Sequence, residues 1–313
     1  MSIAHPIVAV TGSSGAGTST VTDTFCQIFA REGIRGHVVA GDSFHRYDRA
    51  GMKKAEAEAA AAGNPHFSHF GPEANLFDDL EDLFRTYGED GTGRSRHYVH
   101  DEDEAELHGT PPGTFTEWEP IPEGTDLLYY EGLHGALRTE DHDIASHVDL
   151  CIGVAPAINL EWIQKITRDR DVRGYSTEDV TETILRRMPD YVNYICPQFS
   201  NTHINFQRIP VVDTSNPFIA RWIPTPAESM VVIRFADPRG IDFPYLVNMI
   251  EGSFMSRANS IVIPGGRMDL AMQLILTPLI WRLCETGREA RGESRHRGGG
   301  RAGADWGSAY RAR

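Results

Sequence analysis

The chain has 313 residues, of which 40% are hydrophobic and 24% are charged, and these globular proportions argue against extensive disorder. Lys and Arg number 30 and Asp and Glu number 44, so the formal net charge is −14. This balance argues against nucleic acid as the main partner, because a protein that binds nucleic acid needs surplus cations to neutralise phosphates.

The apolar stretches and the cysteines of the sequence indicate the compartment in which the protein works. The longest apolar stretches, such as 270–276, are too short to span a bilayer, and no basic segment followed by an apolar core indicates a signal peptide. The four cysteines are far apart and include no C-x-x-C pair. We therefore expect a cytoplasmic protein with reduced thiols and no membrane partner.

The first forty residues predict a strand, a loop, a helix and a second strand. A short β-rich run at 7–11 leads into a glycine loop at 12–17. Apolar residues then recur at helical spacing through 18–32, and residues 37–40 form the second strand. A βαβ unit of this kind usually starts a parallel sheet that is covered by helices.

The rest of the chain continues the α/β pattern. We expect strands at 127–130, 150–154, 211–212 and 230–235, and helices at 53–62, 76–84, 159–171 and 270–284. The polar stretch 88–124 is interpreted as an exposed insertion or lid. Together these elements predict a single domain over residues 1–286.

Residues 287–313 differ in composition from the rest of the chain. They hold seven glycines and seven arginines against three acids, a net charge of +4. Because this Arg/Gly tail contains few apolar residues, we expect it to stay disordered. RNA binding through the tail is the alternative, and we assign the tail no function.

The most specific motif is the glycine loop, in which Gly12-Ser-Ser-Gly-Ala-Gly-Thr-Ser19 fits G-x-x-x-x-G-x-S/T. The loop lies between a predicted strand and a predicted helix, where backbone N–H groups and the helix N-terminus can hold phosphate. Ser19 is placed to ligate Mg²⁺ through its hydroxyl. The alternative is a tight turn that binds no ligand.

Thr18 occupies the position at which such a loop normally carries a lysine. If ATP binds, another cation must neutralise its β- and γ-phosphates, and the chain has only three lysines. Lys165 shares a predicted helix face with three charged residues: Arg168, Asp169 and Arg173. Three cations and one carboxylate suit a doubly phosphorylated reaction centre, and a surface of ion pairs is the alternative.

Two acids, Asp42 and Glu131, directly follow predicted strands. Ligands of parallel sheets bind beyond the carboxyl ends of the strands, so both acids are expected at the site. Glu131 fits a carboxylate that holds Mg²⁺ or its water, which leaves Asp42 as general base for an acceptor hydroxyl. Each acid could instead be a helix N-cap. Asp42 is followed closely by a group of three residues that could hold an anionic acceptor: His45, Arg46 and Arg49.

Two histidine pairs, His66-x-x-His69 and His97-x-x-His100, have a spacing that a metal could use. Neither pair has a cysteine or a third ligand nearby in the sequence. We therefore do not expect structural zinc.

Several motifs together resemble the bacterial phosphoribulokinases, over about residues 5–284. The lysine-less loop matches from Gly12 to Thr20, and an acceptor segment matches as Gly41-Asp-Ser-Phe-His-Arg-Tyr-Asp-Arg49. Further matches are Tyr130-Glu-Gly-Leu-His-Gly135, Asn159-Leu-Glu-Trp-Ile-Gln-Lys165 with Arg168-Asp169 and Arg173-Gly174, and Val212-Asp-Thr-Ser-Asn-Pro-Phe218.

The resemblance implies a P-loop nucleotide-kinase-like α/β fold whose mostly parallel sheet is covered by helices. It implies transfer of the γ-phosphate of ATP, with Mg²⁺, to the C1 hydroxyl of ribulose 5-phosphate. The products would be ribulose 1,5-bisphosphate and ADP, as in the Calvin cycle of carbon fixation. It also implies a large homo-oligomer that responds to NADH as an activator and to AMP as an inhibitor.

The same resemblance implies roles for particular residues. Asp42 would be the catalytic base, Glu131 and Ser19 would hold the metal, and Asp169 would be a second acid. At the transferring phosphoryl group the resemblance places Lys165 and Arg168. The sugar phosphate would be bound by His45, Arg49 and Arg173, and the effector-site candidates are Arg31, Arg234 and Arg257. ATP would be held by Gly12, Ser13, Ser14, Gly15, Ala16, Gly17, Thr18, Ser19 and Thr20.

Two alternatives to this function stay open. A uridine-kinase-like nucleoside kinase would share the fold, but such relatives normally keep the loop lysine that Thr18 replaces. A nucleotide-sensing scaffold would bind MgATP without turnover. Plant-type phosphoribulokinases carry redox-regulated cysteines in the loop and the sugar site, whereas this chain has no cysteine between Cys26 and Cys151, so thioredoxin control is not expected.

Overall fold

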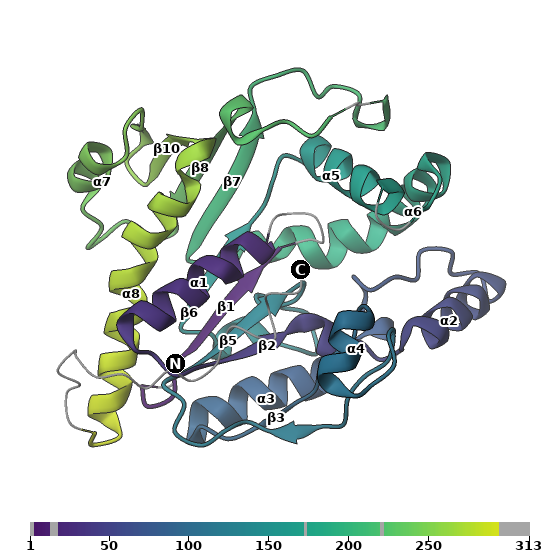
Figure 1. Ribbon diagram of the computed structural model, residues 1–313, viewed down its shortest axis with the longest axis horizontal. Coiled ribbons are helices and arrows are strands. Elements are labelled where there is room, and N and C mark those ends of the chain that lie inside the picture. The colour runs from purple at the N-terminus through teal and green to yellow at the C-terminus, as the bar shows by residue number, and fades with distance from the viewer. Residues whose placement is uncertain (1–2, 13–17, 172–173, 220–221, 294–313) are drawn as a thin grey trace.

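The computed structural model describes residues 3–12, 18–171, 174–219 and 222–293. The strands of its main sheet are β1 (Ile7–Thr11), β2 (Gly36–Ala40), β5 (Leu127–Gly132), β6 (Leu150–Val154), β7 (Ile204–Pro210), β8 (Ser229–Phe235), β9 (Phe254–Arg257) and β10 (Ser260–Pro264). They follow the order β2-β5-β1-β6-β7-β8-β10-β9 (Figure 1). The strands from β2 to β7 in this order run parallel, and β8, β10 and β9 extend the sheet by antiparallel pairing.

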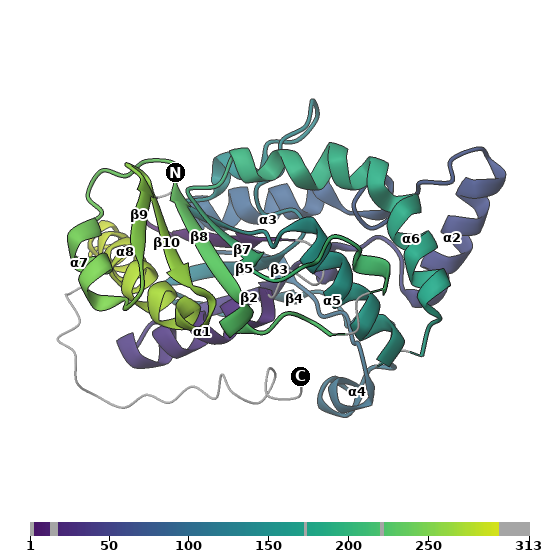
Figure 2. The same cartoon turned by 90° about the horizontal axis from the view of Figure 1, so that it is seen from above.

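Helices cover both faces of this sheet. The α-helices of the described ranges are α1 (Thr18–Glu32), α2 (Arg49–Ala61), α3 (Phe77–Asp90), α4 (Glu102–His108), α5 (Ile158–Asp171), α6 (Thr177–Asp190), α7 (Phe243–Met249) and α8 (Met268–Ala290). Helices α1 and α8 lie on one face and α3 on the other, while α5 and α6 pack together beside the sheet (Figures 1 and 2). No helix in the described ranges is long and apolar enough to cross a membrane.

Strand β1 shows why the centre of the sheet is apolar on both sides. Successive side chains of a strand point to opposite faces. Val8 and Val10 pack in the core cluster that includes α1 and α8, whereas Ile7 and Ala9 pack in the cluster that includes α3. All four side chains are fully buried. The sequence run is therefore continuously hydrophobic, as in other strands that have helices on both faces.

The predicted mostly parallel sheet with covering helices is confirmed. The structure also confirms the bounds 7–11, 18–32 and 150–154. The strand predicted at 211–212 is wrong, because the pairing of β7 with β8 ends at Pro210 and the apolar pair lies just beyond it. The sequence patterns did not indicate strands β7, β9 and β10 or helices α4, α6 and α7.

The predicted insertion at 88–124 is a folded excursion. It contains α4 and a separate two-stranded ladder formed by β3 (Arg94–Ser95) and β4 (Glu119–Pro120). Val99 and Ile121 are buried within it. The excursion therefore has fixed contacts with the main body, and these contacts reach the candidate site.

The predicted boundary of the tail at residue 287 is wrong by several residues. Helix α8 continues to Ala290, and Gly287 and Arg288 are buried. Helix formation continues there because Arg288 binds a buried acid, Asp126, at the start of β5. The disorder predicted for the remainder of the tail concerns residues 294–313, which lie outside the described residues.

Asp126 is the anchor that joins α8 to the sheet. Its side chain is fully buried, and it accepts hydrogen bonds from Arg288 Nε at 3.0 Å and from the Arg35 backbone N–H at 2.8 Å. Burial alone would raise the pKa of Asp126, but the hydrogen bonds from Arg288 and Arg35 outweigh it and lower the pKa. The carboxylate is therefore ionised and paired in the folded protein.

We expect Asp126→Ala to lower the free energy of unfolding in urea by about 3 kcal/mol, because the substitution removes the fully buried carboxylate that pairs with Arg288 and leaves that guanidinium with Glu285 as its ion-pair partner. The matched control is Asp237→Ala, which removes an exposed ion pair with Arg239. The control is expected to leave the unfolding midpoint unchanged. Equal midpoints for the two variants would contradict this role of Asp126.

Candidate active site

The two predicted acids meet at the carboxyl ends of β2 and β5. The strands pair in parallel with Ala40 opposite Glu131, so Asp42 and Glu131 lie at the same edge of the sheet. A Cβ on Gly41 would lie 2.8 Å from Gly132 Cα, so this close approach of the two strand ends requires glycine. The arrangement agrees with the rule that parallel sheets present ligand sites at the carboxyl ends of their strands.

Asp42 lies in the 3₁₀ turn that follows β2, residues Gly41–Phe44. Its two carboxylate oxygens face two imidazoles, with Oδ1 at 3.7 Å from His45 Nε2 and Oδ2 at 3.4 Å from His100 Nε2. The carboxylate side chain is 40% exposed, so an acceptor can reach it. The N-cap interpretation does not hold for α2, whose N-cap is Asp48, with a hydrogen bond from Gly51 N–H.

Three histidines surround this carboxylate on the buried side. His45 stacks on His69 with ring centroids 4.1 Å apart, and His134 Nε2 lies 3.1 Å from the Phe70 carbonyl oxygen. Burial lowers the pKa of His45 although the Asp42 charge opposes the shift. Burial also lowers the pKa of His69 well below its usual value and that of His134 to about 3. These imidazoles are neutral at pH 7 before any anion binds.

The fold separates the two members of each histidine pair. His69 and His100 reach the Asp42 site, whereas His66 contacts the Arg186 carbonyl oxygen and His97 stacks on His108. The described residues contain no group of three or more His, Cys, Asp or Glu side chains arranged to hold a metal.

Helix α5 carries the second predicted cluster. Lys165 Nζ lies 2.6 Å from Asp169 Oδ2, and Arg168 Nε lies 3.1 Å from Asp169 Oδ1. Asp169 is only 5% exposed. Burial lowers the pKa of Lys165, and the Asp169 charge and hydrogen bond oppose that shift. The three side chains share one helix face as predicted, and Arg173 lies outside the described residues.

Arg187 on α6 links the two clusters. Its Nη2 lies 3.0 Å from Glu56 Oε1, and burial lowers its pKa. The Arg187 charge lowers the pKa of His45, His69 and Lys165, so the guanidinium is within Coulombic range of both clusters. Nothing in the sequence pattern singled out Arg187.

Arg49 also lies beside the Asp42 site. Its Nη2 donates to the His100 carbonyl oxygen at 2.7 Å, and its backbone N–H donates to the Gly113 carbonyl oxygen at 2.8 Å. Arg46 instead donates to the carbonyl oxygens of Glu73 and Asn75. Of these two arginines, Arg49 is the one that the structure places next to the candidate base.

Only part of the glycine loop is described. Gly12 is buried at the end of β1 and donates its N–H to the Gly132 carbonyl oxygen at 3.2 Å, and α1 begins at Thr18. The predicted phosphate-binding residues 13–17 and the side chains of Thr18, Ser19 and Thr20 lie outside the described part. The loop therefore starts from the same sheet edge as Asp42 and Glu131.

The three arginines named as effector candidates are separated. Arg234 on β8 and Arg257 on β9 are both exposed and both register with Ser260 of β10, which lies between them. Arg31 lies on α1, where it donates to Gln273 and Thr277 of α8. The structure therefore places Arg234 and Arg257 on the two strands that flank β10, at the same level of the sheet, and no described contact joins Arg31 to them.

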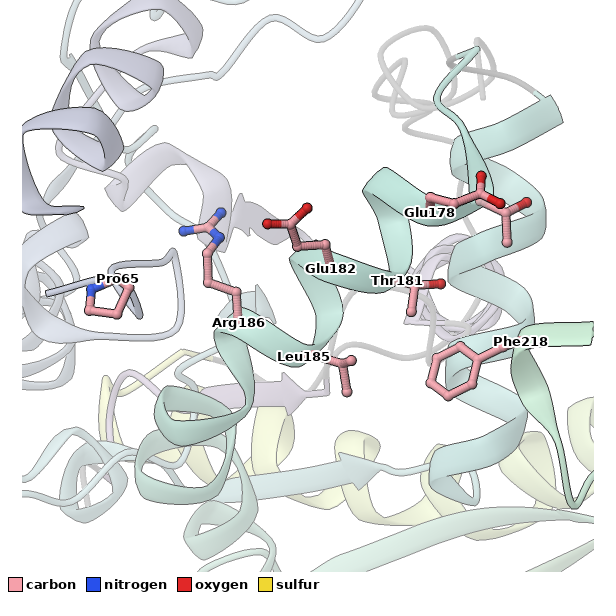
Figure 3. Close-up of a pocket in the computed structure, with 8 residues that line it drawn as sticks. Pro65, Glu178, Thr181, Glu182, Leu185, Arg186 and Phe218 are labelled. Carbon is pink, nitrogen blue, oxygen red and sulfur yellow. The ribbon is translucent and has the colours of Figure 1, made fainter.

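A groove of about 690 Å³ is lined mainly by residues of α6 (Figure 3). Leu185, Arg186 and Phe218 are among the residues that line it, and Pro65 closes one end. None of the predicted site residues lines this groove. Asp42 and Glu131 lie instead at the strand ends described above.

Comparison with known proteins gives a consistent result. A model of the Phosphoribulokinase / Uridine kinase family matches residues 7–215. The chain is 66% identical over 286 residues to a phosphoribulokinase from Nitrobacter vulgaris, with 91% of this chain and 99% of that one covered. It is 67% identical over 290 residues to a phosphoribulokinase from Xanthobacter flavus, covering 93% and 100%. A solved phosphoribulokinase from Rhodobacter spheroides matches with a TM-score of 0.85 and 60% identity, covering 92% and 100%.

Proposed function

The chain belongs to the phosphoribulokinase / uridine kinase family, and we propose from that premise how its residues divide the work of the reaction. It is an ATP-dependent sugar-phosphate kinase that transfers the γ-phosphate of ATP to the C1 hydroxyl of D-ribulose 5-phosphate. The products are ribulose 1,5-bisphosphate and ADP. The high identity to phosphoribulokinases over nearly their whole length supports this acceptor over uridine.

ATP binds at the glycine loop in this proposal, with backbone N–H groups and the N-terminus of α1 directed at its phosphates. Glu131 and Ser19 supply hard oxygen ligands, which are the donors that Mg²⁺ prefers. When bound, Mg²⁺ neutralises charge on the β- and γ-phosphate oxygens. Glu131 suits this task because its strand end lies beside Gly12 and Asp42.

Asp42 is the proposed base. Asp169 is proposed to orient two cations, Lys165 and Arg168. Asp42 takes the proton from the C1 hydroxyl as that oxygen forms its bond to the γ-phosphorus, and the bond from that phosphorus to the bridging oxygen of ADP breaks. Lys165 and Arg168 stabilise charge on the equatorial oxygens, and Asp169 holds both side chains in place through contacts of 2.6 and 3.1 Å. The sugar phosphate is held by His45, Arg49 and Arg173.

The observation that carries the proposal is the position of Asp42 at the strand ends, beside the end of β5 that bears Glu131 and 3.4 Å from His100 Nε2. It is tested by measuring ADP release with a panel of pentose phosphates and with uridine. Ribulose 5-phosphate is expected to support turnover and uridine is not. Turnover with uridine alone would overturn the acceptor, and MgATP-dependent thermal stabilisation with no turnover on any acceptor would favour a sensing scaffold.

Regulation and assembly are further parts of the proposal. We propose NADH as activator, AMP as inhibitor and a large homo-oligomer as the working form, and the family resemblance supports all three. Arg234 and Arg257 support an anion-binding effector site because they flank the same residue of β10. The ADP-release assay is repeated with NADH and with AMP, and Arg234→Ala is expected to weaken the response to NADH. An unchanged response would remove Arg234 from the effector site.

A further inference from the structure

Arg96 holds the backbone segment that carries Asp42. It follows β3 in the folded excursion, and its Nε donates to the Ser43 carbonyl oxygen at 2.8 Å. Its Nη2 donates to the His45 carbonyl oxygen, also at 2.8 Å. One planar guanidinium therefore donates hydrogen bonds to backbone carbonyl oxygens on both sides of Phe44, in the segment directly after Asp42.

Aromatic side chains fix the orientation of this guanidinium. Arg96 lies 3.7 Å from the ring centroid of Phe115 and 4.7 Å from that of Trp118. Trp118 in turn packs edge-on against the buried Phe44 at 5.5 Å. The Arg96 guanidinium and the backbone segment 43–45 thus belong to one cluster, to which the excursion and the turn after β2 both contribute residues.

The turn that carries Asp42 needs such an anchor. It is a single 3₁₀ turn of four residues, and its N-cap residue Ala40 provides no side-chain cap. A turn of this length has poor hydrogen-bond geometry and gains its fixed position from tertiary contacts. The same excursion brings His100 to within 3.4 Å of Asp42, four residues after Arg96.

We propose that Arg96 is a positioning residue that sets the carboxylate of Asp42 for removal of the acceptor proton. The inference rests on the proposed function, because Arg96 would affect the reaction only through Asp42, the proposed base. Lysine cannot replace it, since an ammonium group lacks the planar fork that reaches two carbonyl oxygens while stacking on aromatic rings.

The test compares Arg96→Ala and Arg96→Lys with Arg94→Ala. Arg94 lies on β3 and donates to the Trp118 carbonyl oxygen, so the control removes a hydrogen bond of the same excursion but none that the Ser43 and His45 carbonyl oxygens accept. We expect kcat to fall about 10- to 100-fold in both Arg96 variants, as for a small displacement of a catalytic group. The KM for ATP is expected to stay within about twofold of wild type in both variants.

Rescue separates positioning from general loss of structure. Methylguanidinium at millimolar concentration is expected to restore part of the kcat of Arg96→Ala and none of that of Asp42→Asn. If Arg96→Ala does not fold, Arg96→Lys decides, because it keeps the charge and the aliphatic stem.

Two outcomes would count against the account in different ways. Arg96 variants that keep kcat within about twofold of Arg94→Ala, while Asp42→Asn is inactive, would overturn the inference and leave the base in place. An Asp42→Asn variant with wild-type turnover would overturn the proposed base and the inference with it.

Discussion

Replacement of Asp42 by asparagine is expected to lower kcat by about 10³- to 10⁴-fold, because the variant keeps the shape of the side chain but cannot accept the proton of the acceptor hydroxyl. The affinity for MgATP is expected to stay nearly unchanged, since Asp42 faces His45 and His100 and lies on the acceptor side of the site. A coupled assay of ADP formation measures the first quantity, and equilibrium titration with nucleotide measures the second.

The matched control for this experiment is Asp48→Asn. Asp48 lies six residues further along and caps α2, a role that asparagine fulfils about equally well. The control is therefore expected to keep kcat within about twofold of wild type. If Asp42→Asn behaves like Asp48→Asn, Asp42 is not the base.

Replacement of Lys165 by methionine is expected to lower kcat by about 10²- to 10³-fold, the usual loss when one preorganised charge donor is removed from a transition state. Lys165 is the ammonium group that the account assigns to the transferring phosphoryl, because Thr18 cannot supply one. The side chain is largely buried and contacts Asp169 at 2.6 Å, so its position is fixed before substrate binds. The assay is again ADP formation at saturating ATP.

Lys54→Met is the matched control for Lys165. Its side chain is 77% exposed and pairs at 3.7 Å with Glu58 on the surface of α2. This control is expected to leave kcat unchanged. A Lys165→Met variant with the same kcat as Lys54→Met would show that another cation serves the phosphoryl group.

Local pattern was sufficient for the elements and residues that depend on neighbours in the chain. Helix α1 and strands β1 and β6 have the predicted bounds, since caps, periodicity and apolar runs define them. Asp42 and Glu131 were expected at one edge because parallel strands end together. The shared face of Lys165, Arg168 and Asp169 followed from helical spacing.

Long-range contacts account for what the sequence could not show. Arg187 on α6 and Arg96 in the excursion act on the Asp42 region, and no local motif marks them. His69 stacks on His45 from the loop before α3, whereas the sequence named it only as half of a histidine pair with metal-ligand spacing. The extension of α8 past residue 287 depends on the pairing of Arg288 with Asp126, which lies 162 positions earlier in the chain. Such contacts override the glycine and arginine composition that suggested disorder.

Lys165 is proposed to take the place of the lysine missing from the glycine loop. The most direct measurement is a crystal structure with ribulose 5-phosphate, MgADP and a fluoride analogue of the transferring phosphoryl group. We expect Lys165 Nζ to lie within hydrogen-bonding distance, about 3 Å, of an equatorial atom of that analogue. A structure in which Lys165 Nζ contacts no atom of the analogue while a different cation does would contradict this role of Lys165.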